Sequence, residues 1–403
     1  MKLSEELTWR GFVNQTTYKD LADLDSSPLT FYWGVDPSAD SMTIGHLAAA
    51  MMVKHFIAHG HKAILLVGGA TGLIGDPDGK KQERDLKAIE EIAKNIDGIS
   101  KQYQQIFAGE DFEIVNNNDW FASIGYMEFL RDIGKHMSMT QLLDREFVKK
   151  RIGENGTGIS YAEFSYSLIQ GYDFLHLYRK KGATLQVCGA DQWGNSLAGV
   201  EMIRKLEGKT AHVFSFPLVI NKTTGVKFGK SEEGAVWLDA NKTSVYKFYQ
   251  FWLNVDDESA ADYLKLFTNI QPDEFDNLMG EFKVALAARA AQKYLAYEVT
   301  KLVHGEERAQ SAQKVTAVLF GEQTVSSLSP GDLELLAHEI PVVSPGLASD
   351  CLVQSGTASS KNEARRLIES GAVQVNGQKL SEDAQVDATS LLKKGKNSFI
   401  LVK

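Results

Sequence analysis

Residues 29–70, LTFYWGVDPSADSMTIGHLAAAMMVKHFIAHGHKAILLVGGA, decide the fold. The aromatic and β-branched residues at 29–35 predict a buried strand, and a polar loop with Pro37 follows. Residues 44–60 predict a helix, and residues 62–70 predict a second strand that ends at a glycine pair. A strand–helix–strand unit places its two strands parallel, with a right-handed crossover.

A second stretch, residues 183–206, ATLQVCGADQWGNSLAGVEMIRKL, also predicts a strand, a loop and a helix. The first half of the chain is therefore expected to be α/β, with a Rossmann-like, doubly wound parallel sheet. In such sheets ligands bind beyond the carboxyl ends of the strands. The loops after Val35, Val67 and Val187 are therefore expected to line one crevice.

From about Ser244 the sequence becomes helical, and a proline-containing stretch separates this part from a small α/β end module. We expect four parts: a Rossmann-like domain at 1–220, a helical domain at 221–325, a linker at 326–345 and the end module at 346–403. In the end module, a helix begins after Ser360, and Asn376–Gly377 is a type I′ hairpin signal.

Composition restricts the class of protein. Cys188 and Cys351 are the two cysteines in 403 residues, which excludes a disulfide framework and a multi-cysteine zinc site. No apolar run approaches ~18 residues, so no membrane span is expected, and the polar N-terminus predicts no signal peptide. A cytosolic globular protein is the expectation.

The charge is unevenly distributed. The whole chain carries a net charge of −9, but eight basic and five acidic residues follow from Lys361 onward, so this tail is +3 and residues 1–360 are −12. An acidic chain is not an obvious nucleic-acid binder. A basic end module on an acidic body nevertheless predicts a local nucleic-acid contact.

Two loops could bind a nucleotide or an amino acid. Gly45 and His46 begin a helix directly after a parallel strand, a position that suits phosphate, although a plain capped helix is an equal alternative. The loop GGATGLIGDPDGKKQER at 68–84 fails the phosphate-loop spacing. Its Asp76 would repel phosphate and suits an ammonium group, whereas Lys80 and Arg84 could equally form a solvated basic surface.

Three further segments carry polar groups in patterns that are unusual for a core. Tyr166, Gln170 and Asp173 share one helix face, which indicates either a small-molecule pocket or a water-facing stripe. Asp191 and Gln192 follow a strand, where a carboxylate can bind ribose hydroxyls. Lys227 and Lys230 lie in a glycine-rich loop that could close over a polyphosphate or simply be solvated; their sequence context is KTTGVKFGKSEEGAVWLD.

The chain resembles the bacterial tyrosyl-tRNA synthetases, which are class I aminoacyl-tRNA ligases, over nearly its whole length. The resemblance is carried by LTWRGFVNQTT, YWGVDPSADSMTIGHL, LVGGATGLIGDPDGKK, EFSYSLIQGYDFL, CGADQWGN, KFGKS and AAQKYLAYEVTKLVHGEE. The end module, SKNEARRLIESGAVQVNG, is similar to the small RNA-binding domain named after a ribosomal small-subunit protein.

The resemblance implies a role for each matching residue. Tyr32 and Asp173 would bind the tyrosine phenol, Asp191 the ribose, and Gln192 would lie near the substrate carboxylate. The implied tyrosine-binding set is Tyr32, Asp76, Asn117, Tyr166, Gln170, Asp173 and Gln192, with Asp76, Tyr166 and Gln170 around the ammonium group. The implied ATP-binding set is Gly34, Asp36, Ser38, Gly45, His46, Gly189, Asp191 and Lys230. The implied catalytic set is Thr43, His46, Lys80, Arg84, Lys227 and Lys230.

The same resemblance implies a two-step reaction. Tyrosine and ATP give tyrosyl-adenylate and pyrophosphate, and the tyrosine then passes to the 3′ end of its tRNA. Mg²⁺ would accompany ATP as substrate, with no metal site of the protein's own and no tightly bound cofactor. The partners would be tRNA for tyrosine and a second copy of the chain in a cytoplasmic homodimer, with residues 221–325 binding the anticodon.

Two positions depart from the family pattern, and two alternatives follow. Thr43 replaces the usual first histidine of its signature, and Trp33 replaces a smaller residue.

A tryptophanyl ligase is the nearest alternative, although indole has no phenol and that enzyme lacks the end module. The other alternative is a catalytically inactive RNA-binding or structural protein, which the joint presence of His46, Asp191 and Lys230 disfavours.

Overall fold

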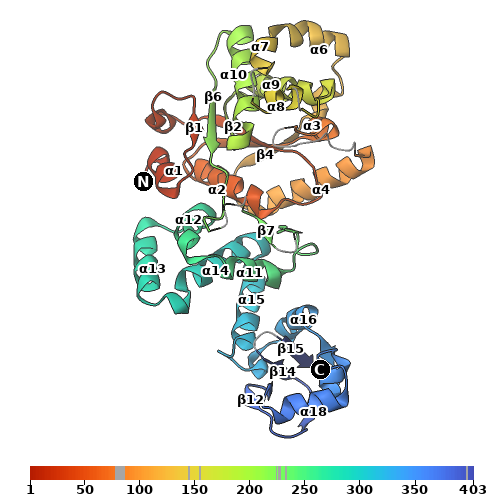
Figure 1. The fold of residues 1–403 in the computed structure, drawn as a ribbon. Helices are drawn as coiled ribbons and strands as arrows, with labels where there is room; N and C mark the ends of the chain where they lie inside the picture. The colour runs from red at the N-terminus through yellow and green to blue at the C-terminus, as the bar shows by residue number, and fades with distance from the viewer. Residues whose placement is uncertain are drawn as a thin grey trace. The chain divides into compact units, whose positions relative to one another are not determined.

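The computed structural model describes residues 1–77, 87–143, 146–153, 156–223, 225, 228–231, 234–395 and 398–403, with only the backbone for Gln141, Glu146, Phe147, Lys150, Lys230 and Ser231. The chain forms two compact units (Figure 1). Unit 1 comprises Met1–Thr243 and Val255–Ala291, and unit 2 comprises Ser244–Asn254 and Gln292–Lys403. The domain boundaries expected at 220, 325 and 345 stay a prediction.

Unit 1 contains a six-stranded sheet in the order β1-β6-β5-β2-β3-β4. Its strands are β1 Gln15–Thr16, β2 Thr30–Val35, β3 Lys62–Val67, β4 Phe112–Asn116, β5 Ala183–Gly189 and β6 His212–Phe216. Strands β2 to β6 are parallel, and β1 pairs antiparallel with β6. The sheet winds outward from the β2–β5 pair in both directions, which confirms the doubly wound prediction.

Helices cover both faces of this sheet (Figure 1). Alternation along β2 sends Phe31 and Trp33 to one face, against Phe56 of α2 and Tyr103 of α4, and Tyr32 to the other face. The helices of unit 1 are α1 Leu3–Arg10, α2 Ile44–Ala58, α3 Gly69–Ile74, α4 Ile89–Ile106, α5 Asn118–Phe121, α6 Tyr126–Asp132, α7 Met139–Leu143, α8 Glu146–Ile152, α9 Tyr161–Lys181, α10 Trp193–Glu207, α12 Asp257–Phe267 and α13 Pro272–Val284. A hairpin of β7 Lys230–Ser231 and β8 Gly234–Ala235 precedes α12.

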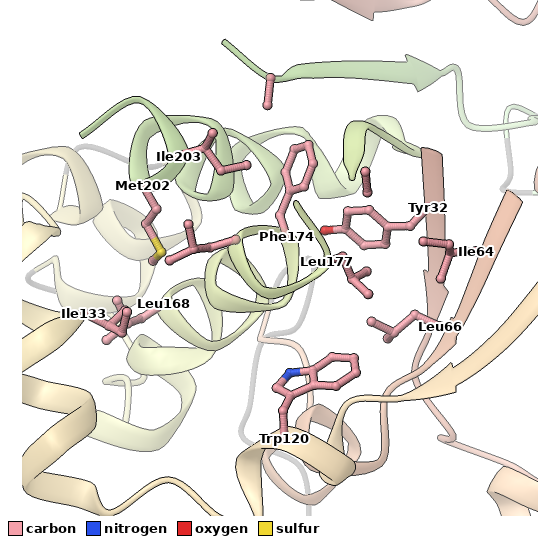
Figure 2. Close-up of a cluster of buried hydrophobic side chains, with 13 residues drawn as sticks. Tyr32, Ile64, Leu66, Trp120, Ile133, Leu168, Phe174, Leu177, Met202 and Ile203 are labelled. Carbon is pink, nitrogen blue, oxygen red and sulfur yellow. The ribbon is translucent and has the colours of Figure 1, made fainter. Parts of the chain in front are cut away.

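A hydrophobic cluster beneath Tyr32 joins the sheet to α9 and α10 (Figure 2). Tyr32 packs on Phe174 of α9, with ring centroids 5.2 Å apart. The cluster also contains Ile64, Leu66, Trp120, Leu177, Met202 and Ile203. The apolar face of α9 is therefore packed in this cluster. This packing fixes the positions of the polar side chains on the other face of the helix.

Unit 2 combines helices with a five-stranded sheet in the order β12-β11-β14-β15-β9. Its helices are α11 Val245–Leu253, α14 Ala290–His304, α15 Glu306–Leu319, α16 Pro330–Glu339, α17 Ala348–Gln354 and α18 Lys361–Glu369. Its strands are β9 Val342–Val343, β11 Val373–Val375, β12 Gln378–Lys379, β14 Ser390–Lys394 and β15 Ser398–Val402, with a separate pair of β10 Gly346–Leu347 and β13 Gln385–Val386. Ser360 caps α18, and Asn376 and Gly377 both have positive φ, as the hairpin prediction requires.

The stretch expected as a linker at 326–345 is not an extended connection, because it contains α16. Pro330 starts this helix instead of breaking it, since proline is tolerated in the first turn, and Ser329 supplies the N-terminal cap. Leu336 of α16 is buried in one cluster with Leu391 and Leu401 of the end-module sheet. This proline-containing stretch is therefore folded against the end module, and its bounds as a linker stay a prediction.

Crossing a bilayer requires a long apolar helix, and none occurs among the helices of the described residues.

Candidate active site

A cavity of about 310 Å³ opens at the carboxyl ends of the parallel strands of unit 1. The loops after β2, β3 and β5 all contribute to its wall, as expected from the strand pattern. It lies where β2 and β5 are neighbours, the point from which the sheet winds in two directions.

Most of the predicted site residues lie together in this cavity. Its lining includes Tyr32, Gly34, Asp36, Ser38, Thr43, Gly45, His46, Asp76, Tyr166, Gln170, Asp173, Gly189, Asp191 and Gln192. Asn117 does not line the cavity and lies behind Asp173. Lys80, Arg84 and Lys227 lie outside the described residues, and the backbone alone of Lys230 is described, in β7.

Asp173 is a buried acid held by two donors. Trp120 donates from Nε1 to one carboxylate oxygen at 2.9 Å, and Asn117 donates from Nδ2 to the other at 3.1 Å. Asn117 is itself held, because its Oδ1 accepts from the backbone of Ala70 at 2.7 Å. Burial nevertheless dominates and raises the pKa of Asp173 to about 8.

The phenol of Tyr32 is only 2% exposed, and its Oη has no hydrogen-bond partner among the described residues. Burial, helped by the nearby Asp173 carboxylate, raises the pKa of Tyr32 well above its ordinary value, so the group remains a neutral donor. A ligand hydroxyl placed between Tyr32 and Asp173 would satisfy both groups.

A second polar region is formed around Tyr166. Its hydroxyl donates to Asp36 Oδ2 at 2.7 Å, and Thr71 donates to Asp36 Oδ1 at 2.6 Å. Gln192 donates from Nε2 to Asp76 Oδ2 at 2.5 Å. Burial, then Asp36, then Asp76, raise the pKa of Tyr166 well above its ordinary value. Two carboxylates here favour a cation. Asp36, which the resemblance assigns to ATP, is therefore hydrogen-bonded to Tyr166, which the resemblance assigns to tyrosine.

The N-terminus of α2 forms a third region of the cavity. The backbone N–H of Thr43 donates to His46 Nδ1 at 3.1 Å, so Nδ1 is an acceptor and a neutral His46 has its proton on Nε2. Within 4 Å, a Cβ added to Gly45 would meet only Thr43 Oγ1, at 3.6 Å. Packing within the chain therefore does not require this glycine, and its backbone leaves open surface for a ligand. Packing within the chain does require a glycine at position 189, because a Cβ there would lie 2.6 Å from Asp191 Oδ1.

Several lining residues were missed from the sequence. Gln186 is buried opposite Tyr32 in the β2–β5 register, and its Oε1 has no partner among the described residues. A polar residue inside the apolar strand ATLQVCG was the available signal for it. Thr71 and Phe228 also line the cavity, and Trp120 supports Asp173, without a local pattern that marks them.

No group of three His, Cys, Asp or Glu residues in the described part of the chain is arranged to hold a metal ion.

Comparison with known proteins decides the family. A family model described as tRNA synthetases class I (W and Y) matches residues 24–321, and one described as the tyrosine–tRNA ligase SYY-like C-terminal domain matches residues 343–403. The tyrosine–tRNA ligase 2 of Bacillus cereus is 42% identical over 100% of this chain and 99% of its own length. The tyrosine–tRNA ligase of Geobacillus stearothermophilus is 43% identical over the whole of both chains. The chain belongs to the class I tyrosine–tRNA ligases.

This ligase activates tyrosine with ATP and charges tRNA, the reaction of its full-length relatives. A mitochondrial tyrosyl-tRNA synthetase structure from Aspergillus nidulans has a TM-score of 0.72 and 30% identity, covering 79% of this chain and 94% of its own. A tryptophanyl-tRNA synthetase from Plasmodium falciparum matches at 16% identity and a TM-score of 0.54, covering 83% of this chain and 89% of its own, which shows a shared fold alone. The tryptophanyl alternative is therefore not supported.

Proposed function

We propose that tyrosine binds in the cavity with its phenol between Tyr32 and Asp173. The carrying observation is that three buried polar atoms of the wall, Tyr32 Oη, Gln170 Oε1 and Gln186 Oε1, have no partner among the described residues. A buried unpaired polar group costs about 1–3 kcal/mol, which a ligand that pairs it recovers. The substrate ammonium is assigned to Asp76, Tyr166 and Gln170, and its carboxylate to the vicinity of Gln192.

ATP is assigned to the α2 end of the cavity. Asp191 would bind the ribose, the open backbone of Gly45 would contact the nucleotide, and Gly34, Ser38 and Gly189 would form the rest of the wall around it. The tyrosine carboxylate attacks the α-phosphorus, an O–P bond forms, and the bond to the pyrophosphate oxygen breaks. The nucleophile is already ionised, so this step needs no general base.

Catalysis is then a matter of positioning and of stabilising charge on the leaving pyrophosphate. His46 Nε2–H and the Thr43 hydroxyl are assigned to this charge, together with the four cations Lys80, Arg84, Lys227 and Lys230. Thr43 supplies a hydrogen bond without a positive charge, so the cations carry a larger share here. Mg²⁺ is proposed to enter with the ATP phosphates as part of the substrate.

The tRNA is assigned to the helical part at 221–325, for the anticodon, and to the basic end module. Lys361, Arg365 and Arg366 of α18 and Lys379 of β12 are exposed, which supports contact with phosphates. Lys361 and Arg365 are paired with Asp350 and Asp383, so Arg366 and Lys379 are the better candidates.

A homodimer is also proposed, in the cytoplasm where tRNA is charged. Six large apolar side chains between residues 126 and 161 of the described chain are exposed: Tyr126, Met127, Met139, Leu143, Ile152 and Tyr161. A hydrogen bond joins Tyr126 to Tyr161, which brings the starts of α6 and α9 together. A second copy covering this surface would remove it from water. Sedimentation should therefore give a dimer, and Met127→Glu should shift it toward monomer.

Calorimetry with tyrosine and three analogues tests the pocket assignment. Phenylalanine lacks the hydroxyl, tyramine the carboxylate and 3-(4-hydroxyphenyl)propionate the ammonium group. We expect both analogues to lose most of the affinity. Phenylalanine makes no hydrogen bond to Tyr32 and Asp173, and the propionate makes none to Asp76. Equal binding of tyrosine and the propionate would contradict the placement of the ammonium group.

A further inference from the structure

The β7–β8 hairpin, which begins at Lys230, is continuous with the segment that caps α2. Val236 donates its backbone N–H to Gly229 O at 3.0 Å, closing the base of the hairpin. Beyond it, Ile44 donates to Val236 O at 3.1 Å and Leu238 donates to Met42 O at 2.9 Å. One arm of the hairpin is therefore fixed to the residues just before His46.

Gly229 allows this close approach. Its φ is +105°, in the region that favours glycine, and a Cβ there would lie 3.1 Å from Ile44 Cγ1. The base of the hairpin thus rests against Ile44 with no room for a side chain.

The other arm is held by Phe228, which is 8% exposed. Its ring lies 4.3 Å from the ring of Tyr263 and 5.7 Å from that of Phe267, both on α12. Its backbone N–H donates to Val219 O at 2.9 Å. Phe228 is therefore clamped between the segment after β6 and an aromatic pair on α12.

Helix α12 is a rigid support for this ring. Tyr263 and Phe267 are buried, and Tyr263 Oη donates to Ile220 O at 3.3 Å. The buried guanidinium of Arg10 donates to the carbonyl oxygens of Lys265, Thr268 and Ile270 at 3.0, 2.9 and 3.1 Å, which satisfies the carboxyl end of the helix.

We propose that Phe228, seated on Tyr263 and Phe267, is a positioning residue that fixes where the hairpin starts and so places Lys230 over the ATP phosphates. The inference rests on the proposed role of Lys230. Lys230 follows Phe228 by two residues, a span of at most about 7 Å, so a shift of the ring is passed to Lys230 with little loss. A misplacement of about 1 Å can cost roughly 10²-fold in rate.

The test measures single-turnover formation of tyrosyl-adenylate in the full-length enzyme. Phe228→Leu should slow this step at least tenfold and change the dissociation constant of tyrosine less than twofold. Phe228→Met should recover most of the rate, because a flexible thioether can fill the same space against Tyr263. Phe275→Leu is the matched control: Phe275 is a buried aromatic residue of α13 that does not line the cavity, and its loss should leave the rate unchanged.

The decisive comparison is made in a Lys230→Ala background. If Phe228 acts through Lys230, Phe228→Leu slows the double variant no further than Lys230→Ala alone. If the rate losses of the two single variants instead multiply in the double variant, Phe228 acts independently of Lys230, for example by direct contact with ATP. This result would overturn the inference, and the proposed function would stand as long as the wild type activates tyrosine. Phe267→Leu gives the same comparison should Phe228→Leu fail to fold. Absence of tyrosine-dependent activation in the wild type would instead refute the proposed function.

Discussion

Replacing Tyr32 by phenylalanine removes one hydroxyl from the buried end of the cavity and leaves Asp173 with its donors Trp120 and Asn117. In the proposed pose, the hydroxyl of bound tyrosine pairs with both Tyr32 and Asp173. With phenylalanine bound, the Tyr32 hydroxyl has no partner and Asp173 keeps only Trp120 and Asn117, so each buried group lacks one hydrogen bond. Each missing hydrogen bond costs about 1–3 kcal/mol, so the two together predict a preference for tyrosine of roughly 30- to 20,000-fold.

Tyr32→Phe should therefore lower the preference by a factor of about 5 to 150, the share of one group, and retain most of the activity. Asp173→Ala should be far more damaging, because it leaves a hole, removes the acceptor of Trp120 Nε1 and leaves Asn117 Nδ2 with only its bond to Thr71 Oγ1 at 3.1 Å. Tyrosyl-tRNA synthetases as a family discriminate against phenylalanine by roughly 10⁵ without editing.

The assay is tyrosine- and phenylalanine-dependent ATP–pyrophosphate exchange, with the ratio of the two kcat/KM values compared between wild type and variant. A Tyr32→Phe ratio equal to that of the wild type would refute the reasoning, because it would show that Tyr32 does not meet the substrate hydroxyl.

The melting temperature of Asp173→Asn, compared with that of the wild type, should shift in favour of the variant between pH 4 and pH 8: folding holds the Asp173 proton up to about pH 8 while the unfolded chain releases it near pH 4, so the wild type loses stability over this interval. A difference that shifts in favour of the wild type as pH rises would contradict the raised pKa. Lys230→Ala should slow adenylate formation and leave tyrosine affinity, measured by calorimetry, nearly intact, because the charge of Lys230 matters only as pyrophosphate leaves. A variant that loses tyrosine affinity and keeps normal turnover would contradict this role. Arg366→Glu with Lys379→Glu should weaken tRNA charging and its salt dependence but not pyrophosphate exchange; unchanged charging would exclude these two residues from the tRNA contact.

Local sequence patterns were sufficient where one element supplies the chemistry. The i, i+4, i+7 spacing of Tyr166, Gln170 and Asp173 correctly placed three polar groups on one face of α9, because the helix period alone fixes that geometry. The strand pattern likewise located the crevice at the ends of β2, β3 and β5.

Contacts between distant segments could not be predicted in this way. The hydrogen bond from Tyr166 to Asp36 joins residues 130 positions apart, and the support of Asp173 by Trp120 crosses from α5 to α9. Local composition also misled at 330–339, where buried Leu336 and the cap at Ser329 outweigh the proline signals and give α16. In each case tertiary packing, which no short window of sequence contains, decides the outcome.

The central claim is that this cavity selects and activates tyrosine, and ATP–pyrophosphate exchange measured with each of the twenty amino acids tests it most directly. The account predicts fast exchange with tyrosine alone, with phenylalanine and tryptophan slower by at least the factor of about 30 expected when two buried groups each lack one hydrogen bond. Exchange with tryptophan as fast as with tyrosine, or no exchange with any amino acid, would contradict it.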